Sequence, residues 1–228
     1  MLNMIKLDWL GMKTYHYVLL LAPLLIYLFG GFMGGWLYIP LAALLMWGGA
    51  LSPFFVEEKG DLNYLYLTLP IHRKAIVRAR FGLSLFLVLA GIVLGIALTI
   101  VNSFLYSGQS MLPGVFQPTF DSIFLLVCVG LFIYALLLLC SFPILFKLGY
   151  AKGQFFGYYV PLCLGGVLLI TLALLPFFVQ PYDMGLLSTL EWVMGSPLWV
   201  ALVILAFAVV FFTFSYLLSQ KAFAKREL

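Results

Sequence analysis

Residues 56–81 read VEEKGDLNYLYLTLPIHRKAIVRARF and separate two long runs of sequence that contain no charged side chain. The chain has 12 Lys and Arg and 8 Asp and Glu, and this stretch gathers eight of these charges: Glu57, Glu58, Lys59, Asp61, Arg73, Lys74, Arg78 and Arg80. The whole chain is 65% hydrophobic and 9% charged, whereas soluble domains carry about 25% charged residues. This composition predicts a membrane protein.

The runs without Asp, Glu, Lys or Arg cover 14–56, 81–120, 122–146, 153–182 and 192–220. A membrane-crossing helix needs about 20 apolar residues, so the first run is long enough for two, with a turn at the glycines of 30–35. The sequence therefore predicts an all-α membrane protein made of one domain, residues 1–228, because no loop is long enough to form a soluble domain. Its six transmembrane helices are predicted at about 15–33, 36–56, 81–105, 123–146, 155–179 and 198–219.

The basic residues predict how the chain is oriented. Lys and Arg accumulate in cytoplasmic loops, and with the N-terminus inside, every Lys and Arg of this sequence falls on the cytoplasmic side. The outer loops then hold only acids: Asp121, Asp183 and Glu191. We expect a multi-pass protein of the plasma membrane with both termini in the cytoplasm. The net charge of +4 then reflects this orientation and gives no reason to expect a nucleic-acid partner.

The charged stretch connects spans two and three on the cytoplasmic side, and its first piece, residues 57–69, has the pattern of a helix. Acids at its start complement a helix N-terminus, and Pro70 ends the helix because the residue before proline disfavours the helical conformation. Apolar side chains follow at the spacing of one helix face: Leu62, Leu65, Tyr66 and Leu69. An apolar face outside the bilayer has to be buried against lipid headgroups, the rest of the chain or another protein.

The second piece, residues 72–80, mixes apolar residues with the basic residues Arg73, Lys74, Arg78 and Arg80. A basic amphipathic helix lies along a membrane surface and holds anionic lipid. We therefore expect the two pieces to form a helical hairpin at the inner face, with the second leading into span three. Within that span, Gly91 and Gly95 have the spacing that lets helix backbones approach closely, either within the bundle or at a dimer seam.

The stretch from Glu57 to Phe81 resembles the connection between spans two and three in ABC-2 type transporter permeases, particularly those of small Gram-positive exporters. Its acidic start, short helix, Leu69-Pro70 pair and basic helix match that pattern, and the six-span layout with about this chain length also fits. His72 departs from the pattern, because a small helix-capping residue such as Ser is expected there.

The resemblance implies a mechanism. Such permeases pair as dimers, with a second copy or a paralogue, and bind two cytoplasmic ATPase subunits that hold ATP and Mg. The short helix after span two is a coupling helix that fits a groove on the ATPase. Carried over to this sequence, the docking residues are Glu57, Glu58, Lys59, Asp61, Leu62, Leu65 and Tyr66.

We therefore expect the permease subunit of an ATP-driven exporter that moves hydrophobic or amphipathic cargo, such as a peptide, an antimicrobial or a lipid-like molecule. The chain itself is not expected to be an enzyme or to bind a cofactor or metal, since it has no phosphate-binding loop of the G-x-x-x-x-G-K-[ST] type and no protease motif. The alternatives are an ATP-independent channel or secondary carrier, and a non-transporting assembly or immunity factor. A carrier is disfavoured because no charged residue lies in the middle of a predicted span.

Overall fold

The computed structural model describes residues 21–28, 37–59, 73–106, 119–179 and 197–225, which are almost entirely helical. Four helical stretches in these ranges are long and apolar enough to cross a membrane: Tyr38–Glu58, Lys74–Leu105, Phe120–Thr171 and Leu198–Ala224. The all-α membrane class is thus confirmed for the described residues. The first predicted span lies mostly outside the described residues, which include only its helical part 21–28, and so does most of the predicted 57–69 helix, since residues 60–72 are not described.

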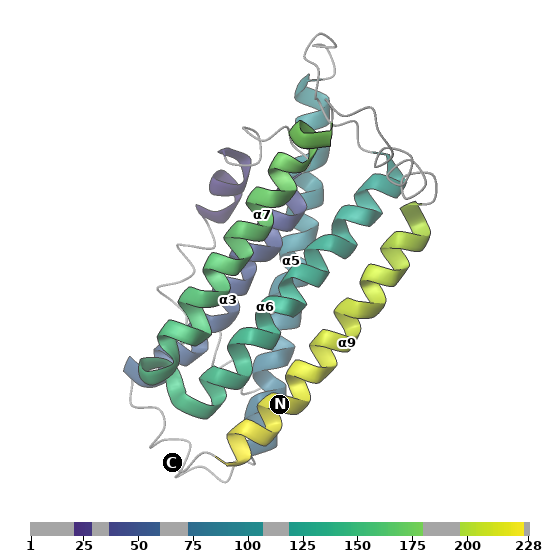
Figure 1. The fold of residues 1–228 in the computed structure, drawn as a ribbon. Helices are drawn as coiled ribbons and strands as arrows, with labels where there is room; N and C mark the ends of the chain where they lie inside the picture. Colours follow the sequence, from purple (N-terminus) through teal and green to yellow (C-terminus); the bar gives the residue numbers. More distant parts are fainter. Residues whose placement is uncertain (1–20, 29–36, 60–72, 107–118, 180–196, 226–228) are drawn as a thin grey trace.

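The helices lie side by side along a common direction (Figure 1). They are α3 (Tyr38–Lys59), α5 (Arg73–Tyr106), α6 (Phe120–Gln154), the short π-helix η1 (Phe155–Tyr159), α7 (Val160–Val179) and α9 (Pro197–Ala224). Helix α3 packs against α5 and α6, and α6 packs against α9 and against η1. The centre of the bundle therefore lies along α3 and α6, whereas α9 leaves much of its apolar surface exposed, as expected for a helix that faces lipid.

Helix α5 begins well before the predicted third span and runs without interruption from Arg73 to Tyr106. Its 34 residues make it about 51 Å long at 1.5 Å per residue, while the hydrocarbon core of a bilayer is about 30 Å thick. The basic segment is therefore the first two turns of the span-three helix, which corrects the prediction of a separate helix along the membrane surface. The physical reason is packing, because Ile76, Val77 and Ala79 in this segment are buried in the bundle.

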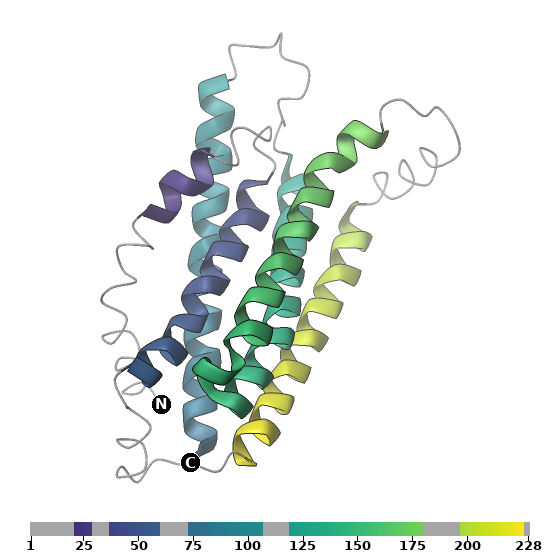
Figure 2. The ribbon, with the colours of Figure 1, turned by 60° about the vertical axis from the view of Figure 1, so that its left-hand side comes forward.

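The chain reverses direction at Gly149, a non-helical position near the end of α6 (Figure 2). Residues 147–152 around it are called the α6–α7 turn. Gly149 has φ 77° and ψ 177°, a backbone conformation that is almost restricted to glycine because any Cβ would clash there. Helical structure resumes directly after it and passes through η1 into α7. This turn brings residues 147–152 to the same end of the bundle as the C-terminal end of α3.

The crossing of α5 and α3 depends on two glycines. A Cβ added to Gly95 would lie 2.8 Å from the Cα of Ile39, and one added to Gly91 would lie 2.5 Å from Cγ of Met46. Both glycines thus face α3, so their close approach lies within the bundle. A buried hydrogen bond joins the same two helices, since Tyr38 Oη donates to Asn102 Oδ1 at 3.1 Å. A second one joins α6 to α5, where Tyr134 Oη donates to the Ser84 carbonyl at 2.7 Å.

Candidate functional site at the charged end of the bundle

Almost all the charge of the described helices lies at one end of the bundle. The C-terminal ends of α3 and α9, the beginning of α5 and the turn at Gly149 meet there (Figure 2). In the described ranges, Asp121 in the first turn of α6 is the exception. The charged residues that gather at this end are Glu57, Glu58, Lys59, Arg73, Lys74, Arg78, Arg80, Lys147, Lys152, Lys221 and Lys225.

Glu57 and Arg80 form a buried ion pair between α3 and α5. Nη2 of Arg80 donates to Oε2 of Glu57, and the two side chains are 2% and 6% exposed. The guanidinium carbon of Arg80 lies 4.2 Å from the centre of the Phe54 ring and 5.5 Å from that of Phe146. A guanidinium over an aromatic face is attracted by the ring's quadrupole, and more strongly where water is excluded.

This pair corrects two sequence expectations. Arg80 was expected to hold anionic lipid at the membrane surface, and Glu57 to meet an ATPase. Each has its charge inside the bundle, directed at the other. The reason is that both residues lie beside aromatic side chains of the core. Glu57 lies one turn after Phe54 on α3, Arg80 directly precedes Phe81 on α5, and both rings pack against Phe142.

The aromatic cluster around the pair joins four helices. Phe54 meets Phe142 and Phe146 edge to face, with ring centres 5.4 and 4.9 Å apart. Phe146 in turn meets Phe223 of α9 at 5.4 Å, and Phe81 of α5 meets Phe142 at 4.8 Å. Such edge-to-face pairs stabilise packing beyond the area they bury, by about 0.5–1.5 kcal/mol each. The cluster therefore holds α3, α5, α6 and α9 in a fixed relation around the ion pair.

Glu58, the next residue, makes a different connection. Its carboxylate accepts a hydrogen bond from the backbone N–H of Ala151, just after the Gly149 turn. Nearby, the rings of Phe55 and Tyr150 meet edge to face with centres 5.3 Å apart. Consecutive acids on α3 thus attach this helix to α5 on one side and to the α6–α7 turn on the other.

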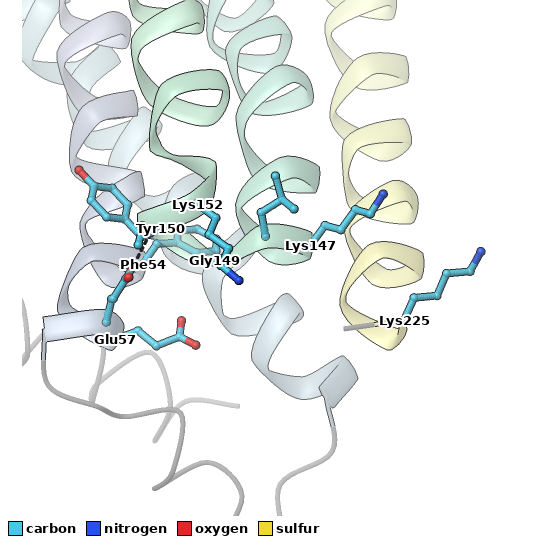
Figure 3. A pocket seen from close by; sticks show the side chains of 10 residues that line it. Phe54, Glu57, Lys147, Gly149, Tyr150, Lys152 and Lys225 are labelled. Atoms are coloured by element: carbon cyan, nitrogen blue, oxygen red, sulfur yellow. Dashed lines mark hydrogen bonds between the residues drawn. The ribbon is translucent and has the colours of Figure 1, made fainter. Parts of the chain in front are cut away.

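A cavity of about 520 Å³ opens between these elements (Figure 3). Phe54, Glu57 and Glu58 line it from α3, residues 147–152 line it from the turn, and Lys225 lines it from the end of α9. In Figure 3, the side chains of Lys147 and Lys225 point to the α9 side, away from Glu57. The cavity lies next to the last described residues of α3, from which residues 60–72 lead to α5.

The remaining predicted site residues divide into two groups. Lys59 ends α3 and Arg73 begins α5, while Lys74 and Arg78 are exposed on α5. The other predicted docking residues lie outside the described residues: Asp61, Leu62, Leu65 and Tyr66. Their role in binding an ATPase stays a prediction.

Sequence reasoning missed the α6–α7 turn as a partner of α3. Ala151 is 93 residues away from Glu58 in the sequence, and no local pattern connects them. The available signal was the pair of glycines in Gly149-Tyr150-Ala151-Lys152-Gly153, which lies between the predicted spans 123–146 and 155–179. Among the described residues, no group of His, Cys, Asp and Glu side chains is placed to hold a metal ion.

Long apolar helices packed in a bundle, with their basic side chains collected at one end, define a multi-pass helical membrane protein. Residues 3–224 match the family described as ABC-2 family transporter protein. The chain belongs to this family and is the membrane component of an ABC-2 type transporter. Neither a curated protein nor a solved structure matches the chain.

Proposed function

We propose that this chain is the permease subunit of an ATP-driven exporter, and that a separate ATPase drives it through the 57–69 segment. Membership of the family implies an ATPase partner in general. The observation that carries the proposal is the pair of connections made by Glu57 and Glu58. They attach the end of α3, where this segment begins, to α5 and to the α6–α7 turn.

These connections give the segment a mechanical role. Residues 60–72 join Lys59 to Arg73, the last residue of α3 and the first of α5. A force applied there acts on both helices, and the buried pair makes them move together because separating Glu57 from Arg80 leaves two uncompensated charges. Through Glu58 the same movement reaches α6 and α7. In this mechanism Glu57 transmits the force, and the ATPase contacts Leu62, Leu65 and Tyr66 with the polar residues beside them.

The cargo we propose is hydrophobic or amphipathic, exported from the cytoplasm or from the membrane, with both termini of the chain cytoplasmic and two permease chains forming the path. Apart from the Glu57–Arg80 pair at the charged end, the buried polar residues within the described spans are neutral: Ser52, Ser84, Thr99, Asn102, Ser141, Ser215 and Ser219. A path lined in this way lacks the charged groups that an ion-coupled carrier uses. It suits cargo that carries its own apolar surface.

The test is the double variant Leu62→Asp/Leu65→Asp in the full chain, expressed with its ATPase. We expect it to insert in the membrane normally and to lose co-purification of the ATPase in mild detergent, because two carboxylates would oppose burial of an apolar helix face. Lys74→Asp/Arg78→Asp is the matched control, since it adds acids at exposed positions of α5. Normal ATPase binding by the leucine variant rules out this docking face.

A further inference from the structure

A groove distinct from the cavity described above lies on the outside of the charged end, between α6, η1 and α9. It has a volume of about 500 Å³. Its walls are apolar, formed by Pro143, Ile144 and Leu148 of α6, Phe156 of η1, and Leu218 and Ala222 of α9. Phe156 is 59% exposed and Leu148 is 43% exposed, so the groove presents a large apolar surface outward.

Three lysines complete the lining of this groove: Lys147, Lys221 and Lys225. They come from two helices that are far apart in the sequence, and Lys221 and Lys225 lie one helical turn apart on the same face of α9. No acid lines the groove, and none of the three lysines has an ion-pair partner among the described residues. Like charges gathered without a counter-ion repel one another, so an anion bound between them would be stabilised.

The position of the lysines along their helices places them at the membrane boundary. Lys147 is the first charged residue after the run 122–146, and Lys221 is the first after the run 192–220. The apolar wall therefore continues into the hydrocarbon, and the amines lie at headgroup level. Basic pockets of this kind between transmembrane helices bind anionic lipid headgroups.

We propose that this groove binds an anionic phospholipid, with an acyl chain along Ile144, Phe156 and Leu218 and its phosphate between the three lysines. The apolar wall selects a lipid over a free phosphate ion, and the unpaired amines select an anionic over a neutral headgroup. The proposal requires only that the chain is a membrane protein. It is independent of how an ATPase docks or what cargo moves.

The experiment uses the full chain in nanodiscs that contain phosphatidylglycerol diluted in phosphatidylcholine with the same acyl chains. After extraction in mild detergent, the phospholipid retained by each chain is counted by native mass spectrometry. We expect saturable retention of phosphatidylglycerol, well above its share of the bilayer. Because a basic side chain near a lipid surface contributes about fivefold to the attraction, Lys147→Gln/Lys221→Gln/Lys225→Gln should reduce retention by up to about a hundredfold.

The control Lys74→Gln/Arg78→Gln/Lys152→Gln removes the same charge from exposed positions at the same end of the bundle and should keep the bound lipid. Ala222→Trp fills the groove with every lysine in place and should lose the lipid. Excess inorganic phosphate should not displace it. Equal loss in the two triple variants, retention by Ala222→Trp, or displacement by phosphate alone would each overturn the proposal.

A measurement on the unmodified chain avoids any effect of these substitutions on folding. Phosphatidylglycerol with a photoactivatable diazirine in its acyl chain should label peptides from 143–156 and 217–225. Labelling that spreads evenly over the exposed faces of α7 and α9 would show that no such site exists. Cross-links from this groove to a second copy of the chain would assign it to an interface between chains and would also overturn the proposal.

Discussion

Arg80 and Glu57 are paired inside the protein, although both belong to the segment with the most charge in the sequence. The guanidinium of Arg80 lies between the carboxylate of Glu57 and the face of Phe54, 4.2 Å from the ring centre. The pair joins α3 and α5 at the point where residues 60–72 leave one helix and lead to the other. Because the pair is buried, separating the two charged side chains would cost a large free energy, so the pair holds the two helices together.

Removing one member of the pair should be far more harmful than replacing both. Glu57→Gln leaves the charge of Arg80 buried without a counter-ion, and such changes cost about 3–5 kcal/mol. In Glu57→Gln/Arg80→Met no charge remains buried, and much of this loss should be recovered. Denaturant unfolding in detergent micelles measures both variants. If the single variant is as stable as the double one, the two charges do not depend on each other.

Loss of the Glu58 carboxylate should weaken the coupling of transport to ATP hydrolysis without weakening ATPase binding. Glu58→Gln weakens the acceptor for the Ala151 N–H, since a hydrogen bond to a charged group contributes about 1.5–3 kcal/mol and a neutral one about half of that. We expect ATPase binding to be unchanged and cargo transport per ATP hydrolysed to fall, because movement of α3 would reach the α6–α7 turn less fully. The measurement is transport and ATP hydrolysis in the same proteoliposomes. A proportional loss of both would place Glu58 in the docking surface instead.

Gly149 should tolerate no side chain. Its φ of 77° with ψ of 177° is a conformation that costs other residues on the order of 1–3 kcal/mol, so Gly149→Ala should lower stability by about that amount. Gly153→Ala is the control, because its added Cβ meets nothing closer than Leu145 at 3.4 Å. Thermal unfolding of the purified chain compares them. Equal stability of the two variants would contradict the turn described at Gly149.

A second pair of glycine variants tests the contact between α3 and α5 within the membrane. Gly95→Ala places a Cβ 2.8 Å from the Ile39 Cα, and backbone atoms cannot move aside as a side chain can. Overpacking of this type costs about 1–3 kcal/mol. Gly166→Ala on α7 meets nothing within 4 Å and should leave stability unchanged or raise it slightly through helix propensity. A Gly95→Ala protein that unfolds at the wild-type temperature would show that α3 and α5 are not in this contact.

Much of the fold was predictable because membrane thickness sets the length of an apolar helix. The sequence predicts spans at 36–56 and 198–219, and the structure has α3 at Tyr38–Lys59 and α9 at Pro197–Ala224. The differences lie at the charged ends, where helices continue beyond the apolar run. Helix α5 shows this most clearly: its first two turns are charged, and the sequence pattern favours a separate surface helix there. Only the burial of Ile76, Val77 and Arg80 makes it continuous with the span.

The candidate site was less predictable because its contacts join distant positions. Glu57 and Glu58 are neighbours with the same charge, and from the sequence alone both are expected to dock an ATPase. In the structure, Glu57 turns inward to Arg80, and Glu58 reaches the backbone of Ala151. Which way each acid points depends on the rotation of α3 against α5 and α6, and the aromatic rings around Phe54 set that rotation. No periodicity within residues 57–69 contains this information.

The amino-acid sequence by itself determined that this is a helical membrane protein and where its charge is concentrated, because hydrophobic run length and the placement of Lys and Arg follow from the cost of exposing polar groups to lipid. Only the tertiary structure decided which charges are neutralised inside the bundle and which remain free at its rim. Arg80 is paired and buried, whereas Lys147, Lys221 and Lys225 line an apolar groove to which no described residue contributes an acid. The physical reason is that electrostatic interactions depend on distance and on exclusion of water, and packing between helices far apart in the sequence sets both.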